Sequence, residues 1–165
     1  RQMCIRDSPE MKLVIAPHVV SDSHLKEILD KVKRPCIRYT EATEENVTQA
    51  DCLIIDCYGL LSSIYRYGEI SYIGGGFGVG IHNVLEAAVY GIPVIFGPNN
   101  KKFREAQHLL EQKGGFEVTG YDDFKRLMDK FLSDEAYLQQ AGKAAGNYVN
   151  HNAGALEKIM KDITL

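Results

Sequence analysis

The sequence predicts an α/β fold built on a doubly wound parallel sheet. Short apolar runs alternate with amphipathic stretches from Met11 onward, and this alternation is typical of β-α-β units. The apolar runs predict strands at residues 12–16, 36–39, 52–56, 70–73, 93–96 and 116–118. The other stretches predict helices at residues 21–32, 43–47, 60–67, 82–90, 101–112, 121–132, 134–150 and 155–162. A length of 165 residues fits one domain with a sizeable core.

The first elements are bounded by residues that stop strands and cap helices. Pro17 stops the first strand, and Ser21 is a preferred N-cap residue for the helix that follows. The apolar residues of that helix recur along one face, at Leu25, Ile28, Leu29 and Val32. Thr43 begins a short capped helix, and the helix before the fourth strand ends near Gly68.

Glycine and proline mark the boundaries of the later elements. Gly91 suits the left-handed residue that closes a helix. Pro93 then begins a strand, a position where it removes no interior ladder bond. A turn at residues 97–100 leads into the next helix. The apolar side chains of that region are expected in the core, at Phe103, Leu109 and Leu110.

Composition excludes several classes of protein. The net charge of -3 provides no basic field for nucleic acid. No apolar run approaches the roughly 18 to 20 residues that span a bilayer, so we expect this domain to be soluble. The four cysteines show no C-x-x-C pair and no zinc-ligand spacing. We therefore expect reduced thiols in a cytosolic compartment, and no metal site.

The domain organisation follows from the same patterns. Residues 1–10 show no periodicity, and we expect a non-native or disordered leader there. Residues 11–165 contain no linker, repeat or low-complexity tract and predict a single domain. The chain does not begin with Met, and we expect it to be a fragment of a longer protein.

A glycine-rich turn at residues 74–80 follows the fourth predicted strand. It holds five glycines in seven residues. Ligands of open α/β sheets bind beyond the carboxyl ends of the strands, and backbone N–H groups at a helix start can face a phosphate. We therefore predict that Gly74, Gly75 and Gly76 bind an anionic part of a ligand, although tight turns also select glycine for steric reasons. The turn lacks the patterns typical of ATPases and dehydrogenases.

Three polar residues follow the turn in the first part of the predicted helix. Glu86 lies about one helical turn beyond His82 and Asn83, so all three are expected to face the same crevice. An ionised glutamate only accepts hydrogen bonds, which suits the vicinal hydroxyls of a ribose. The alternative is a carboxylate that only complements the helix dipole.

Other candidate residues follow neighbouring strands. Lys101, Lys102 and Arg104 are predicted at a helix start, where cations oppose the dipole, and this placement favours a nearby anion over a solvated charged face. His18 follows the first strand and is a candidate donor to a phosphate or carboxylate. Asp56 follows the third strand, where it caps the next helix or orients a ligand.

Two segments of the chain form a recognisable pattern: residues 70–88, ISYIGGGFGVGIHNVLEAA, and residues 91–98, GIPVIFGP, with Phe103 after them. Together they resemble the donor-binding half of the 3-deoxy-D-manno-octulosonic acid (Kdo) transferases of lipid A biosynthesis. Residues 16–18 and 56–59 fall where this family keeps a Pro-Arg-His-like and an Asp-x-x-Gly-like motif. The resemblance extends to the C-terminus.

Two positions depart from the family pattern. The arginine that many members place between Pro17 and His18 is absent, and Leu60 stands where many have glutamate. We expect Lys101 and Lys102 to supply the missing positive charge.

The resemblance implies a GT-B glycosyltransferase in which this chain is the C-terminal, Rossmann-like half that binds the CMP-Kdo donor. It implies an inverting, metal-independent transfer of Kdo to a lipid A precursor, without a cofactor, in lipopolysaccharide core biosynthesis at the cytoplasmic face of the bacterial inner membrane. The family's catalytic carboxylate and its acceptor and membrane contacts belong to the N-terminal domain, so we expect no catalytic residue here and no activity from this chain alone. The expected donor-binding residues are His18, Gly74, Gly75, Gly76, His82, Asn83, Glu86, Lys101 and Lys102.

Two other functions remain compatible with the residues. A GT-B domain that uses a UDP- or GDP-sugar would share the glycine-rich turn and Glu86. A non-catalytic α/β nucleotide-binding module is the alternative outside the enzymes. A receiver-like module is less suitable, because it needs an acidic pair after its first strand, where this chain has Pro17 and His18.

Overall fold

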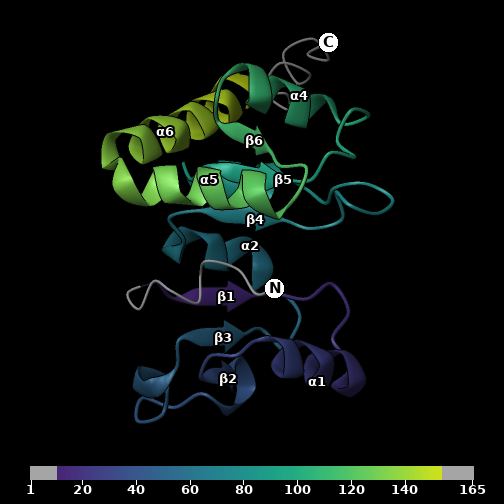
Figure 1. Cartoon of the computed structure of the whole chain (residues 1–165), viewed down its shortest axis with the longest axis vertical. Coiled ribbons are helices and arrows are strands. Elements are labelled where there is room, and N and C mark those ends of the chain that lie inside the picture. Colours follow the sequence, from purple (N-terminus) through teal and green to yellow (C-terminus); the bar gives the residue numbers. More distant parts are fainter. Residues whose placement is uncertain (1–10, 154–165) are drawn as a thin grey trace, which may run out of the picture. The chain divides into compact units, whose positions relative to one another are not determined.

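A computed structural model describes residues 11–153 of the chain. The chain divides into two compact units, with the boundary between Ile64 and Tyr65. Each unit contains a three-stranded parallel sheet and helices, so the predicted α/β class and the parallel strands are confirmed (Figure 1). The predicted leader and the predicted helix at residues 155–162 lie outside the described residues.

The sheet of the first unit places its third strand in the centre. Its strands are β1 (Leu13–Ile15), β2 (Cys36–Arg38) and β3 (Cys52–Ile54), in the order β1-β3-β2. Its helices are α1 (Asp22–Lys31), η2 (Tyr39–Glu41), η3 (Val47–Gln49) and α2 (Leu61–Ile64). The usual doubly wound order puts the second strand beside the first. Here β3 takes that place, and as the central strand it is the most deeply buried of the three.

Helix α1 forms as the sequence predicts. The Ser21 hydroxyl accepts a hydrogen bond from the His24 N–H at 3.4 Å and caps the first turn. Leu25 is buried against Cys52 and Ile54 of β3. The remaining apolar residues of that face are partly buried against the same cluster, at Ile28, Leu29 and Val32.

The cysteines of the described chain are free thiols, as expected. Cys52 is buried, whereas Cys36 and Cys57 are partly buried. Burial, and then the adjacent Cys36 thiol, raises the pKa of Cys52 to about 12. Cys52 is therefore a protonated, apolar core side chain at neutral pH.

The second unit has a sheet with consecutive strands side by side. Its strands are β4 (Ser71–Ile73), β5 (Val94–Phe96) and β6 (Gly115–Glu117), in the order β4-β5-β6. Its helices are η4 (Tyr65–Tyr67), α3 (Leu85–Ala88), α4 (Arg104–Glu111), α5 (Tyr121–Ser133) and α6 (Glu135–Asn152). The central strand β5 is fully buried, and α6 contacts α3, α4 and α5. Figure 1 shows α6 beside α4 and α5.

Two helices begin later than the sequence predicts. Helix α3 starts at Leu85 instead of residue 82, with Val84 as its N-cap residue. In the loop before it, the Asn83 side-chain oxygen accepts a hydrogen bond from the Leu85 N–H at 3.0 Å. Helix α4 starts at Arg104 instead of residue 101. The Phe103 N–H donates to the Asn100 carbonyl at 2.9 Å, so the residues before Arg104 form a turn. His82, Asn83 and the two lysines therefore lie in loops.

Within residues 11–153 no helix combines the length and the apolar character needed to cross a bilayer.

Candidate functional site

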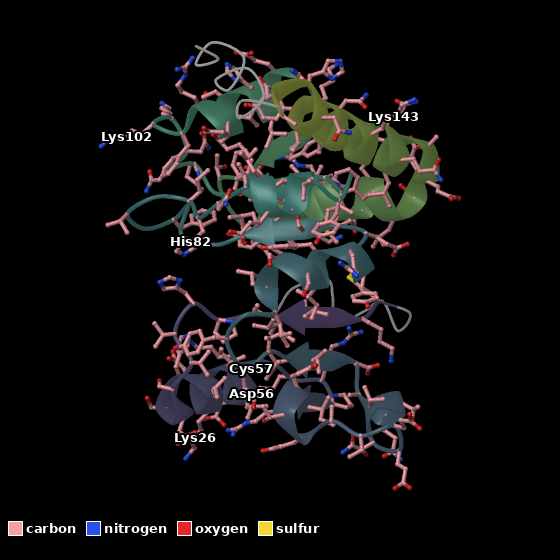
Figure 2. The ribbon with its side chains drawn as sticks, turned by 180° about the vertical axis from the view of Figure 1, so that it is seen from behind. Lys26, Asp56, Cys57, His82, Lys102 and Lys143 are labelled. Atoms are coloured by element: carbon pink, nitrogen blue, oxygen red, sulfur yellow. The ribbon has the colours of Figure 1, made fainter. Side chains whose placement is uncertain are left out.

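The candidate site lies in the second unit, where the loops that follow β4 and β5 meet. The carboxyl ends of neighbouring parallel strands open at one edge of a sheet, which is the usual place for a ligand. Asn99 joins the two loops: its N–H donates to the Gly76 carbonyl at 2.9 Å, and its side-chain amide donates to the Gly78 carbonyl at 2.5 Å. His82 and Lys102 lie at this edge in Figure 2.

The glycine-rich turn is packed backbone against backbone. A Cβ on Gly76 would lie 2.5 Å from the Gly97 nitrogen, and a Cβ on Gly97 would lie 2.6 Å from the Gly76 carbonyl carbon. Gly75 has a φ of 89°, and a Cβ there would meet the Gly80 carbonyl oxygen at 2.1 Å. The steric reason for these glycines is therefore present in the structure.

Part of the backbone of the turn is satisfied internally. The N–H groups of Gly78 and Gly80 donate to the Gly75 carbonyl, and the His82 N–H donates to the Gly74 carbonyl. These N–H groups are thus engaged within the loop. The anion-binding role of Gly74, Gly75 and Gly76 stays a prediction.

The loop after β4 and the start of α4 frame a pocket of about 380 Å³. Its lining residues are Ile81, His82, Asn83, Val84, Leu85, Phe103 and Glu105. His82 and Asn83 were predicted here. Phe103, predicted as a core residue, is partly buried and forms a wall of the pocket. Glu105 was not predicted, because nothing in the local pattern shows that the start of α4 faces the loop after β4.

Asn83 and Glu86 lie together, as the sequence predicts. The Asn83 side-chain amide donates to a Glu86 carboxylate oxygen at 3.0 Å. Burial, and then the negative charge of Glu86, raises the pKa of the Tyr65 hydroxyl. Glu86 is an acceptor-only group in the first turn of α3.

Lys101 and Lys102 lie in the turn before α4, not at its start. Both are exposed, and neither pairs with a described residue. The Lys102 side chain extends away from the second unit in Figure 2. Arg104 is the first residue of α4. The two lysines place positive charge beside the loop junction.

Asn100 was missed by sequence reasoning and holds the second loop in place. Its side chain is fully buried. The amide nitrogen donates to the Gly97 carbonyl at 2.9 Å and to the Glu117 carboxylate at 2.6 Å, and the amide oxygen accepts from Gln107 at 2.6 Å. A buried polar side chain with this many partners fixes the loop relative to β6 and α4. The only local signal was the Gly-Pro-Asn turn.

Two candidate residues belong to the first unit. His18 is exposed in the loop after β1. Asp56 accepts hydrogen bonds from the N–H and hydroxyl groups of Thr40, at 3.0 and 2.6 Å. Asp56 therefore binds η2 through Thr40 and does not cap α2, the helix that follows. Although partial burial opposes ionisation, the Thr40 donors and the Arg38 charge lower the pKa of Asp56 overall.

Among the residues from 11 to 153, no group of three or more His, Cys, Asp and Glu side chains is placed to hold a metal ion.

Comparison with known proteins shows the relatives of the chain. No protein-family model matches it. The 3-deoxy-D-manno-octulosonic acid transferase of Aquifex aeolicus is 32% identical over 125 residues, which cover 74% of this chain and 34% of that protein. The enzyme of the same name from Haemophilus influenzae is 29% identical over 158 residues, covering 92% of this chain and 36% of that protein. This chain is a homologue of the Kdo transferases.

The chain spans about a third of the length of these relatives. Its fold matches the crystal structure of the C-terminal CMP-Kdo binding domain of WaaA from Acinetobacter baumannii. The TM-score is 0.70 and the sequence identity 17%, over 88% of this chain and 77% of that domain. This match confirms the predicted Rossmann-like half of a GT-B fold.

Proposed function

We propose that this chain binds the CMP-Kdo donor of a Kdo transferase, which transfers Kdo to a lipid A precursor. The observation that carries the proposal is the similarity to Kdo transferases over as much as 92% of the chain. The glycine-rich loop, Asn83 and Glu86 lie inside a fold that matches a CMP-Kdo binding domain. The acceptor, the inner-membrane location and the catalytic base belong to the proposal for the whole protein.

Each part of the donor has a suitable partner at the loop junction. Glu86, held by Asn83, accepts hydrogen bonds from the two ribose hydroxyls. Lys101, Lys102 and the glycine-rich loop attract the phosphate and the carboxylate of the sugar acid.

The proposed contribution to catalysis is stabilisation of the leaving group. In the transfer, the bond between the anomeric carbon and the phosphate oxygen breaks, and a bond from that carbon to the acceptor oxygen forms. The hydroxyl proton passes to a base, and negative charge develops on departing CMP. Cations held near this phosphate lower the energy of the transition state.

The test compares CMP, UMP, GMP and AMP by thermal unfolding of the wild-type chain and of Glu86→Ala. A ligand at a hundredfold excess over its Kd stabilises the folded state by about 2.7 kcal/mol. For a domain of this size the melting temperature rises by roughly 5 to 10 °C. CMP should give the largest rise, and Glu86→Ala should lose most of it because ribose hydroxyls are left unpaired.

The control variant is Glu69→Ala, which removes an exposed carboxylate before β4 and should keep the full CMP response. If Glu86→Ala keeps the full CMP response, Glu86 does not bind the ribose and only complements the helix dipole. A larger response to UMP or GMP would indicate that the donor is a UDP- or GDP-sugar and that the transferred sugar is not Kdo. No response to any nucleotide at millimolar concentration would refute the proposal.

A further inference from the structure

The pocket at the loop junction contains a carboxylate that the donor-binding scheme above does not use. Glu105, the second residue of α4, lines this pocket with His82 and Asn83. Its side chain has no hydrogen bond or ion pair with another residue of the described chain. Burial raises the pKa of Tyr148, and the negative charge of Glu105 raises it further. The carboxylate is therefore available to a ligand.

A carboxylate restricts what this pocket can accept. It accepts hydrogen bonds and donates none, and it repels phosphate and carboxylate groups. Its position in the first turn of α4 also complements the helix dipole. That local role does not depend on the pocket, whereas recognition of a neutral hydroxyl group does.

The other walls of the pocket suit a carbon skeleton. The Phe103 ring is partly buried beside Gly80, where a Cβ on the glycine would lie 3.0 Å from the ring. Leu85 lies in the same lining. Apolar walls with a few polar groups are typical of sites that bind small molecules.

We propose that Glu105 is a specificity-determining residue that accepts hydrogen bonds from hydroxyl groups of the transferred sugar. This inference rests on the proposed function. An octulosonic acid carries a carboxylate near its anomeric carbon and hydroxyl groups along the rest of its chain. Lys101 and Lys102 then attract the carboxylate end of the sugar, and Glu105 with the Phe103 wall receives the hydroxyl-bearing end.

The experiment measures binding of CMP and of CMP-Kdo by calorimetry to the wild-type chain, Glu105→Ala, Glu105→Gln and Glu111→Ala. Because CMP lacks the transferred sugar, Kdo, its Kd should stay within about twofold of the wild-type value in every variant. The Kd for CMP-Kdo should rise about tenfold in Glu105→Ala, since a charged hydrogen-bond acceptor is lost. Glu105→Gln keeps an acceptor oxygen and should give a smaller rise.

Glu111→Ala is the matched control, because it removes an exposed carboxylate from the other end of α4. It should bind both ligands as the wild type does. If Glu105 acts only through its charge, Glu105→Ala will bind both anions more tightly, and the inference is overturned. Equal weakening for both ligands, or no change, also overturns it while leaving the proposed function intact. If the wild-type chain binds neither ligand, the proposed function fails and the inference fails with it.

Discussion

Asp56 is held by two donors from a single residue, the N–H and hydroxyl groups of Thr40. Burial alone would raise the pKa of this carboxyl group, but the Thr40 hydrogen bonds and Arg38 lower it below its ordinary value. A carboxyl group with a lowered pKa stabilises the folded state at pH values above its unfolded pKa, which is about 3.9. That stability is lost as the pH falls through the lower, folded pKa.

We therefore expect Asp56→Asn to lower the melting temperature at pH 7, with the difference from the wild type shrinking below about pH 4. Thermal unfolding across pH 2.5 to 7 measures this. Asp30→Asn removes one negative charge from α1 without touching Thr40 and serves as the control. A difference between wild type and Asp56→Asn that is the same at all pH values would show that Asp56 does not act through its ionisation.

At the level of single residues, the sequence predicted interactions that form within a few positions. The Ser21 cap is one example, and the proximity of Asn83 to Glu86 is another. The hydrogen bond from Asn100 to Glu117 and the position of Glu105 in the pocket were not predicted, because the partners come from distant parts of the chain. Asp56 was placed correctly after a strand, but its partner 16 residues earlier was not identified.

At the level of elements, the loops after β4 and β5 depend on a close backbone approach. A Cβ on Gly97 would lie 2.6 Å from the Gly76 carbonyl carbon and 2.9 Å from the Phe77 ring. Gly97→Ala should therefore destabilise the chain by about 1 to 3 kcal/mol, as overpacking does. The melting temperature should fall by roughly 2 to 12 °C, and CMP binding should weaken because the loops separate.

Gly120→Ala provides the comparison for this effect. A Cβ on Gly120 meets nothing within 4 Å, and its φ of -179° suits any residue. This variant should melt within about 2 °C of the wild type, as surface substitutions usually do. If Gly97→Ala and Gly120→Ala have the same melting temperature, the two loops move apart without loss of stability, which contradicts their close packing.

The existence of most elements was predictable, whereas their boundaries at the site were not. The strand runs and the helix α1 follow from apolar periodicity and capping. The starts of α3 and α4 were predicted three residues too early, because local hydrogen bonds at Asn83 and Asn100 hold the preceding residues in turns. Periodicity alone does not show which polar residue ends a loop.

At the level of the whole molecule, the parallel sheet was predicted as one sheet, but the strands pair in two sheets of three. Pairing partners depend on contacts between distant segments, and β3 pairs with both β1 and β2. The two sheets still match the fold of a CMP-Kdo binding domain.

A larger pocket of about 790 Å³ lies beside β6 and α5 and offers a competing site. Its lining includes Phe116, Arg126 and Tyr137. It is not formed by the loops after β4 and β5, and Arg126 is already paired with Asp123. Size alone therefore does not identify the nucleotide site.

The central claim is that a cytidine nucleotide binds where the loops after β4 and β5 meet. Titration of the ¹⁵N-labelled chain with CMP, followed by amide chemical shifts, tests this most directly. We predict saturable shifts that are largest in residues 74–86 and 97–105. Shifts centred on the pocket beside β6, at Phe116, Arg126 and Tyr137, or no shifts at millimolar CMP, would contradict the account.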